Sequence, residues 1–162
     1  MAELTHLEEK LAEVFGLARA AEESTRKVAG LVDDEEVAGL LETMRDEARE
    51  TAARCEELAA GMDGRKTAIQ EKARETKREA TDMMSTYLGD DADGLDGFEF
   101  LTMAEAGEVG HWEILGAMAK TAGQKPVQDL VGWALPIQQR HLETVRTCSI
   151  RMAEATDPGD TA

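Results

Sequence analysis

The chain has 162 residues with 42% hydrophobic content, which suits the core of a single domain. It carries 34 acidic against 18 basic residues, a formal net charge of −16. Such a field repels nucleic-acid phosphate and anionic membrane surfaces, and no apolar run is long enough for a membrane span. We therefore expect a cytoplasmic protein that binds neither nucleic acid nor membrane. The composition fits adaptation to a salt-rich cytoplasm, and equally a very soluble acidic surface.

The sequence predicts an all-α fold, because only three prolines interrupt it and no alternating strand pattern occurs. Cys55 and Cys148 fall on apolar faces of different helices, so we expect buried thiols without a disulfide. Residues 1–155 are expected to form one domain, and residues 156–162 a frayed tail. The predicted helices are Glu3–Gly30, a helix from the capping residues Asp33 and Asp34 to Met62, Lys66–Leu88, Phe98–Ala122 and Pro126–Glu154.

Residues 66–88 differ from the other helices in having a narrow apolar stripe and a largely charged surface. This pattern predicts a peripheral helix on the outside of a bundle. The loop 89–97 that follows is acidic and resembles a calcium loop. Its register fails, because placing Asp91 and Asp93 at positions 3 and 5 puts Phe100 at position 12, where Glu is required. We predict a linker in which Asp96 caps the next helix.

Two predicted helices each carry a polar pair inside an apolar stripe. Glu108 and His111 lie in one stripe, and Gln138 and His141 in the next, each pair spaced i, i+3. The short connection between these helices predicts antiparallel neighbours, with the two pairs at a similar height. Buried acids and histidines require partners, either a metal ion or one another. A one-residue shift in helix register would instead move Glu108 to the edge of its stripe.

In dimetal-carboxylate bundles, two helices supply Glu-x-x-His and the other two supply a single Glu each. Here the second motif has Gln138 in place of Glu, and the single acids are less certain. Weaker candidate ligands lie at stripe edges or beside the first motif: Glu22, Glu47 and Glu105. The four main residues could hold iron, manganese or zinc, or form a metal-free hydrogen-bonded cluster that fixes helix register.

The segment Val109-Gly110-His111-Trp112-Glu113-Ile114 is similar to the Val-Glu-His-Tyr-Glu-Ile motif of the YciE/YciF family of the ferritin-like superfamily. The opening Leu7-Glu8-Glu9-Lys10 also resembles the start of that family. The resemblance implies a ferritin-like antiparallel four-helix bundle with an extra peripheral helix, often dimeric and associated with stress. The chain departs from the family at Gly110, in its Gln-Gln-Arg-His last-helix motif and in a second helix without Glu-x-x-His.

Three functions follow as hypotheses. The first is a metal-binding, stress-related bundle; oxidase or peroxide chemistry requires a redox-active metal with an open position, so whether the protein is an enzyme stays open. The second is a non-catalytic structural or interaction bundle with a metal-free polar cluster. The third, an acidic mimic of nucleic acid, depends on charge alone. We expect a homodimer, and the sequence identifies no other protein partner.

Overall fold

The computed structural model describes residues 3–162 and contains five helices and no strand within that range. The predicted all-helical fold is confirmed, while the ferritin-like assignment stays a prediction. The helices are α1 (His6–Ala29), α2 (Glu35–Ala60), α3 (Lys66–Tyr87), α4 (Gly94–Ala122) and α5 (Lys125–Glu154).

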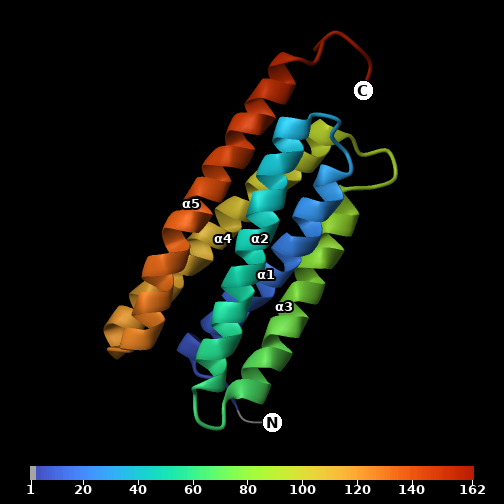
Figure 1. Ribbon diagram of the computed structural model, residues 1–162. Coiled ribbons are helices and arrows are strands. Elements are labelled where there is room, and N and C mark those ends of the chain that lie inside the picture. Colours follow the sequence, from blue (N-terminus) through green and yellow to red (C-terminus); the bar gives the residue numbers. More distant parts are fainter. Residues whose placement is uncertain (1–2) are drawn as a thin grey trace.

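Helices α1, α2, α5 and α4 form a four-membered ring in which sequence neighbours run antiparallel (Figure 1). Helix α1 packs against α2 and α4, and α5 packs against the same two helices. Helix α3 lies outside the ring against α1, touches α2 less and barely contacts α4. It carries the chain from the end of α2 back to the opposite end of the bundle, where α4 begins (Figure 1). The predicted peripheral helix is thus the long crossover connection of the bundle.

Three helices begin at residues other than those predicted. Helix α5 begins one residue early, at Lys125 instead of Pro126, and capping boxes explain the other two differences. In α1, Thr5 is the N-cap and exchanges hydrogen bonds with Glu8, so the helix begins at His6 rather than Glu3. In α4, Asp93 is the N-cap and Asp96 is its partner three residues later. The prediction that Asp96 caps this helix was wrong, because Asp93 satisfies the free amide groups one turn earlier.

The hydrophobic core is divided into two clusters along the bundle axis. One cluster centres on Leu11, Phe15 and Trp112, and the other on Phe98 and Leu101. Between them, each of the four ring helices presents polar side chains to the interior instead of apolar ones: Ser24, Thr25, Glu47, Thr51, Glu105, Glu108, Gln138 and His141. This polar layer interrupts an otherwise apolar core and is the natural place to look for a functional site.

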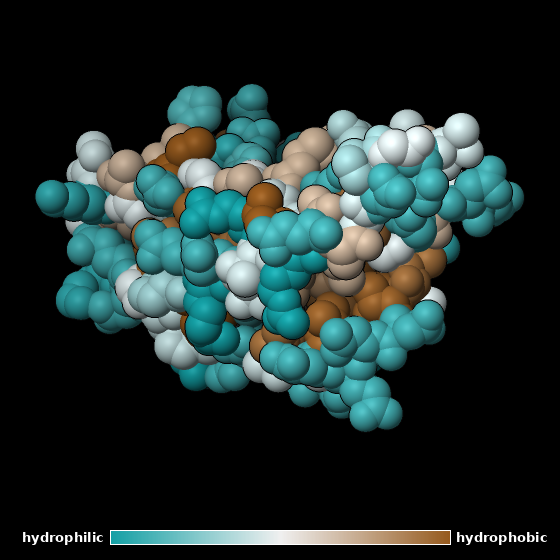
Figure 2. Space-filling view, turned by 90° about the horizontal axis from the view of Figure 1, so that it is seen from above, coloured by the Kyte–Doolittle hydropathy of each residue, from teal (hydrophilic) through white to brown (hydrophobic). Residues whose placement is uncertain are grey.

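The outer surface is predominantly hydrophilic, as expected from the charge. Seen from the end near the C-terminus, Figure 2 shows mostly hydrophilic residues, with hydrophobic residues visible between them in several places. None of the helices described in residues 3–162 is both long and apolar enough to cross a membrane.

Candidate functional site

The candidate site is the part of the polar layer formed by Glu47, Glu105, Glu108, Gln138 and His141, which we call the central polar cluster. Helix α2 supplies the first residue, α4 the two other acids, and α5 the amide and the imidazole. Glu105, Gln138 and His141 are each only 1% exposed. Removing such groups from water is costly, so every polar atom that lacks a partner here requires an explanation.

The first residues of the two predicted pairs meet across α4 and α5. The Gln138 Nε2 donates a hydrogen bond to Glu108 Oε2 at 2.9 Å, and both side chains are buried. This contact places Glu108 and Gln138 at a similar height in the bundle, as predicted. The other amide atom, Gln138 Oε1, has no hydrogen-bond partner among the described residues.

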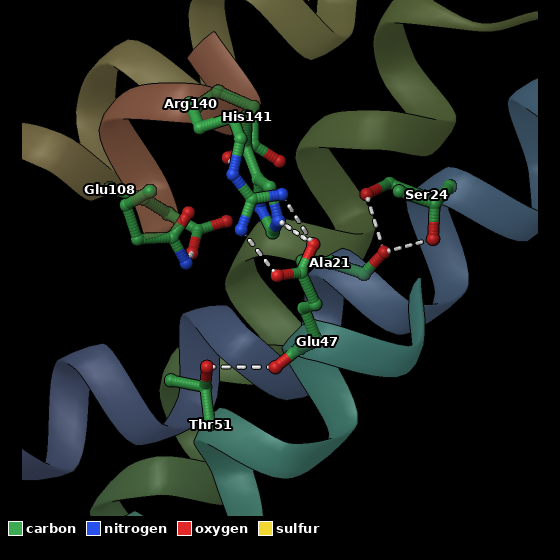
Figure 3. A network of polar contacts seen from close by, with 10 residues as sticks. Ala21, Ser24, Glu47, Thr51, Glu108, Arg140 and His141 are labelled. Carbon is green, nitrogen blue, oxygen red and sulfur yellow. Dashed lines mark hydrogen bonds and ion pairs between the residues drawn. The ribbon is translucent and has the colours of Figure 1, made fainter. Parts of the chain in front are cut away.

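His141 is held from the side of α2. Its Nε2 lies 3.2 Å from Glu47 Oε1, and Arg140 donates two hydrogen bonds to the same carboxylate, one of them 2.9 Å long (Figure 3). The Arg140 hydrogen bonds hold the pKa of Glu47 below its usual value. Because an ionised Glu47 can only accept a hydrogen bond from the ring nitrogen facing it, the arrangement favours His141 with Nε2 protonated and Nδ1 free.

Glu105 is the least satisfied member of the cluster. Its Oε2 lies 3.8 Å from His141 Nδ1, too far for a hydrogen bond, and has no other partner in residues 3–162. Burial raises the pKa of Glu105 to about 8. A buried carboxyl oxygen and an imidazole nitrogen therefore face each other across a short gap that no protein atom bridges.

The other ionisable groups complete the charge balance of the cluster. Burial, with a contribution from neighbouring Glu105, raises the pKa of Glu108 well above its usual range, although the Gln138 hydrogen bond opposes this. Burial also lowers the pKa of His141, against the opposing effect of Glu47. Burial thus favours the protonated form of both α4 acids and the neutral form of the imidazole, while Glu47 is paired with Arg140.

The structure does not bring His111 together with the other three main candidates. Its side chain is 36% exposed, and its Nδ1 lies 3.2 Å from Glu13 and 3.4 Å from Lys10 Nζ, both on α1. Burial and then the Lys10 charge lower the pKa of His111, while Glu13 acts in the opposite direction. Only one of the two predicted Glu/Gln-x-x-His motifs therefore directs its histidine into the bundle.

The weaker candidates divide in the same way. Glu47 and Glu105 belong to the cluster, and Glu105 is more deeply buried than its place beside the main motif suggested. Glu22 instead lies 3.6 Å from Arg49 and takes no part. Helix α1 contributes only Ser24 and Thr25 at this level, whose hydroxyl groups donate to the carbonyl of Ala21 (Figure 3).

The sequence did not predict that Arg140 hydrogen-bonds to Glu47, nor that His111 contacts residues of α1. The signal for Glu105 was available, since it lies i, i+3 from Glu108 and so shares its face. Cys55 and Cys148 are both free and buried, as predicted, and lie outside the cluster.

As the side chains stand, no three His, Cys, Asp or Glu residues between 3 and 162 converge closely enough to hold a metal ion. The donor types nevertheless suit iron, manganese or zinc, because carboxylate oxygens and an imidazole nitrogen are their common ligands. Two atoms bound to one such ion at about 2.1 Å stand roughly 3.0–3.4 Å apart. The 3.8 Å gap between Glu105 and His141 would close with a movement of less than about 1 Å.

No protein-family model, curated protein or solved structure matches this chain. The family is therefore not shown by comparison, and the function has to be argued from the central polar cluster itself.

Proposed function

We propose that this protein binds a divalent transition-metal ion in the central polar cluster, with Glu105 and His141 as principal ligands. The single observation that carries the proposal is the unpartnered Glu105 Oε2 facing His141 Nδ1 at 3.8 Å. A metal ion would satisfy both atoms at once. Glu108 and the free Gln138 Oε1 lie beside them as further oxygen donors.

The remaining members of the cluster suit the role of supporting groups. A metal-bound histidine usually donates its other ring N–H to a carboxylate, which fixes its orientation. Glu47 stands in that position at His141 Nε2, and Arg140 fixes the carboxylate in turn. The single crossover connection through α3 is also the topology of ferritin-like bundles, which supports the family resemblance at the level of topology alone. Only that resemblance supports a stress-related role, because none of the contacts in this site points to one.

A second function is favoured by the hydrogen bonds already present. Gln138 satisfies Glu108, and Arg140 satisfies Glu47, so most of the cluster is paired without an ion. In this alternative the polar layer fixes the register of α2, α4 and α5 in a non-catalytic structural or interaction bundle.

Metal content separates the two functions. The protein is purified without a histidine tag, stripped with a chelator, loaded separately with Fe²⁺, Mn²⁺, Zn²⁺ or Co²⁺, and analysed by mass spectrometry and by the visible absorption of Co²⁺. We expect one tightly held ion, bound more weakly as pH falls because the carboxyl groups must lose their protons. Glu105→Gln and His141→Phe should each weaken binding beyond the roughly 10- to 100-fold cost of losing an outer-shell partner.

His111→Phe is the matched control, because it replaces the histidine that faces α1 instead of the cluster. Its metal affinity should equal that of the wild type. A wild-type protein that takes up none of the four ions after loading, while Glu105→Gln and His141→Phe alter only stability, would establish the metal-free bundle instead.

A further inference from the structure

A cavity of about 420 Å³ lies between α1, α3 and α4, on the side of α4 away from α5. It exists because α3 packs on α1 but barely contacts α4, and because small residues form much of its wall: Ala20, Ala21, Ala80, Ala104 and Gly107. Its volume is within the range of small-molecule sites, about 300–1,000 Å³. Along α4 it extends from Phe100 to His111, roughly 16 Å at 1.5 Å per residue.

One end of the cavity is apolar and open. Met83 and Met103 line it and are 53% and 40% exposed, although side chains of this kind are usually covered. Phe100 lies beside them, and Tyr87 packs against it with ring centroids 5.9 Å apart. Exposed apolar side chains gathered at a hollow mark binding sites, and thioethers adapt to ligands of varied shape.

The other end of the cavity is polar, and its two lysines are already in ion pairs; Glu79, which also lines the cavity, is exposed to solvent. Lys10 forms an ion pair with Glu13, and Lys72 lies 3.3 Å from Glu75. Neither lysine is free to hold an anionic head group, and Glu13 is not free to hold a cationic one. Thr76 and His111 supply hydrogen-bonding groups at the same end. An anionic ligand would have to break the ion pair of a lysine, and a cationic ligand would find only Glu79, whose exposed charge is screened by water; an uncharged ligand disrupts no ion pair.

We propose that this cavity binds an uncharged, elongated and mainly apolar small molecule, with its polar end near His111 and its chain directed toward Met83 and Met103. A long-chain alcohol has the required chemistry. Glu108 of the central polar cluster also lines the wall of this cavity, but binding of an uncharged ligand needs no metal ion, so the chelator-treated protein tests this site separately from the proposed metal function.

The test uses Nile red, an uncharged dye whose fluorescence rises in apolar surroundings, with the chelator-treated full-length protein. Saturable binding is expected, with displacement by 1-dodecanol below its solubility limit. Dodecanoate and dodecyltrimethylammonium, compared below their micelle concentrations, should displace the dye at least about tenfold less effectively. Displacement by either ion at equal or lower concentration than the alcohol would overturn the uncharged-ligand assignment, and an absence of saturable dye binding would overturn the site.

Two glycine variants locate the binding in this cavity. Gly107 lines the cavity and Gly110 does not, while an added Cβ at either position meets nothing within 4 Å. Gly107→Leu should therefore fill the cavity without a backbone clash and weaken dye binding at least about tenfold. Gly110→Leu should leave it unchanged, and helical circular dichroism should be preserved in both. Equal affinity in the two variants would place the dye elsewhere on the protein and contradict the proposal.

Discussion

At the scale of single residues, Glu105 has an Oε2 atom without a hydrogen-bond partner among residues 3–162, in a layer whose other acids are paired. Burial stabilises its protonated form, so Glu105 keeps its proton to a higher pH in the folded protein than in the unfolded chain. This difference makes its contribution to stability dependent on pH.

Replacing Glu105 by Gln should make the metal-free protein more stable at high pH and change little at low pH. Below pH 4.5 both folded and unfolded states are protonated; as pH rises toward 8, only the unfolded state ionises and stability is lost. The difference in the free energy of unfolding grows by about 1.4 kcal/mol for each pH unit between the unfolded-state and folded-state pKa values of Glu105. The gain from the Gln variant therefore reaches at most several kcal/mol.

Urea denaturation of both proteins between pH 4 and 9, with a chelator present, measures the difference. Repulsion among the other acidic groups changes the free energy of unfolding of both proteins alike, so it cancels in the difference between variant and wild type. A difference that does not grow between pH 5 and 8 would show that Glu105 is ionised in the folded protein.

Arg140→Ala removes the clamp on Glu47. Because the Arg140 side chain is 54% exposed, screening by water limits the loss of stability at pH 7 to about 0.5–1 kcal/mol. The loss should shrink in acid, because the Glu47 carboxylate is protonated as the pH falls through its depressed folded-state pKa and no longer pairs with Arg140. Thermal denaturation at pH 7 and pH 3.5 measures both values; an equal loss at the two pH values would argue against the ion pair as its origin.

At the scale of helices, α1 and α3 approach each other closely at Gly16. A Cβ added at Gly16 would stand 2.4 Å from the carbonyl oxygen of Ala73 and 2.8 Å from the Thr76 Cβ. Glycine is thus required where the peripheral helix crosses α1, and this close contact fixes one wall of the α1–α3–α4 cavity.

Gly16→Ala should reduce the free energy of unfolding by about 1–3 kcal/mol, because it forces the two backbones apart. Gly39→Ala is the matched control, since Gly39 lies within α2 and its added Cβ meets nothing within 4 Å. That control should gain roughly 0.5–1 kcal/mol from helix propensity. Urea denaturation compares the two; similar changes in both variants would mean that α3 does not pack on α1 as described.

At the scale of the whole molecule, the net charge of −16 is distributed over a bundle in which several ion pairs are exposed and join residues one turn apart on the same helix. Such pairs contribute little stability, so the excess of acidic side chains is balanced mainly by solvent ions. The melting temperature should therefore rise with NaCl, because screening shortens the Debye length from about 30 Å at 0.01 M to 3 Å at 1 M.

Calorimetry in NaCl and in KCl tests this dependence. Equal rises in the two salts indicate screening. A melting temperature that falls with salt would show that local ion pairs outweigh the overall repulsion.

The sequence by itself determined the helices and the polar residues on their inner faces. Apolar periodicity located all five helices, because each must bury one stripe, and it placed Glu108, Gln138 and His141 inside. The start of α4 was misplaced because Asp93 and Asp96 both suit a cap, and only the backbone geometry selects the first.

The tertiary structure decided which helix each inner side chain faces. Residues three apart differ by about 60° around a helix, so Glu105 and His111 diverge by about 120° with Glu108 between them. Glu105 turns toward His141 on α5, and His111 turns toward Glu13 on α1. A helical projection gives each residue an angle on its own helix, whereas the neighbour at that angle depends on the packing of helices distant in sequence. For the same reason, the pairing of Arg140 with Glu47, 93 residues apart, became visible only in the folded bundle.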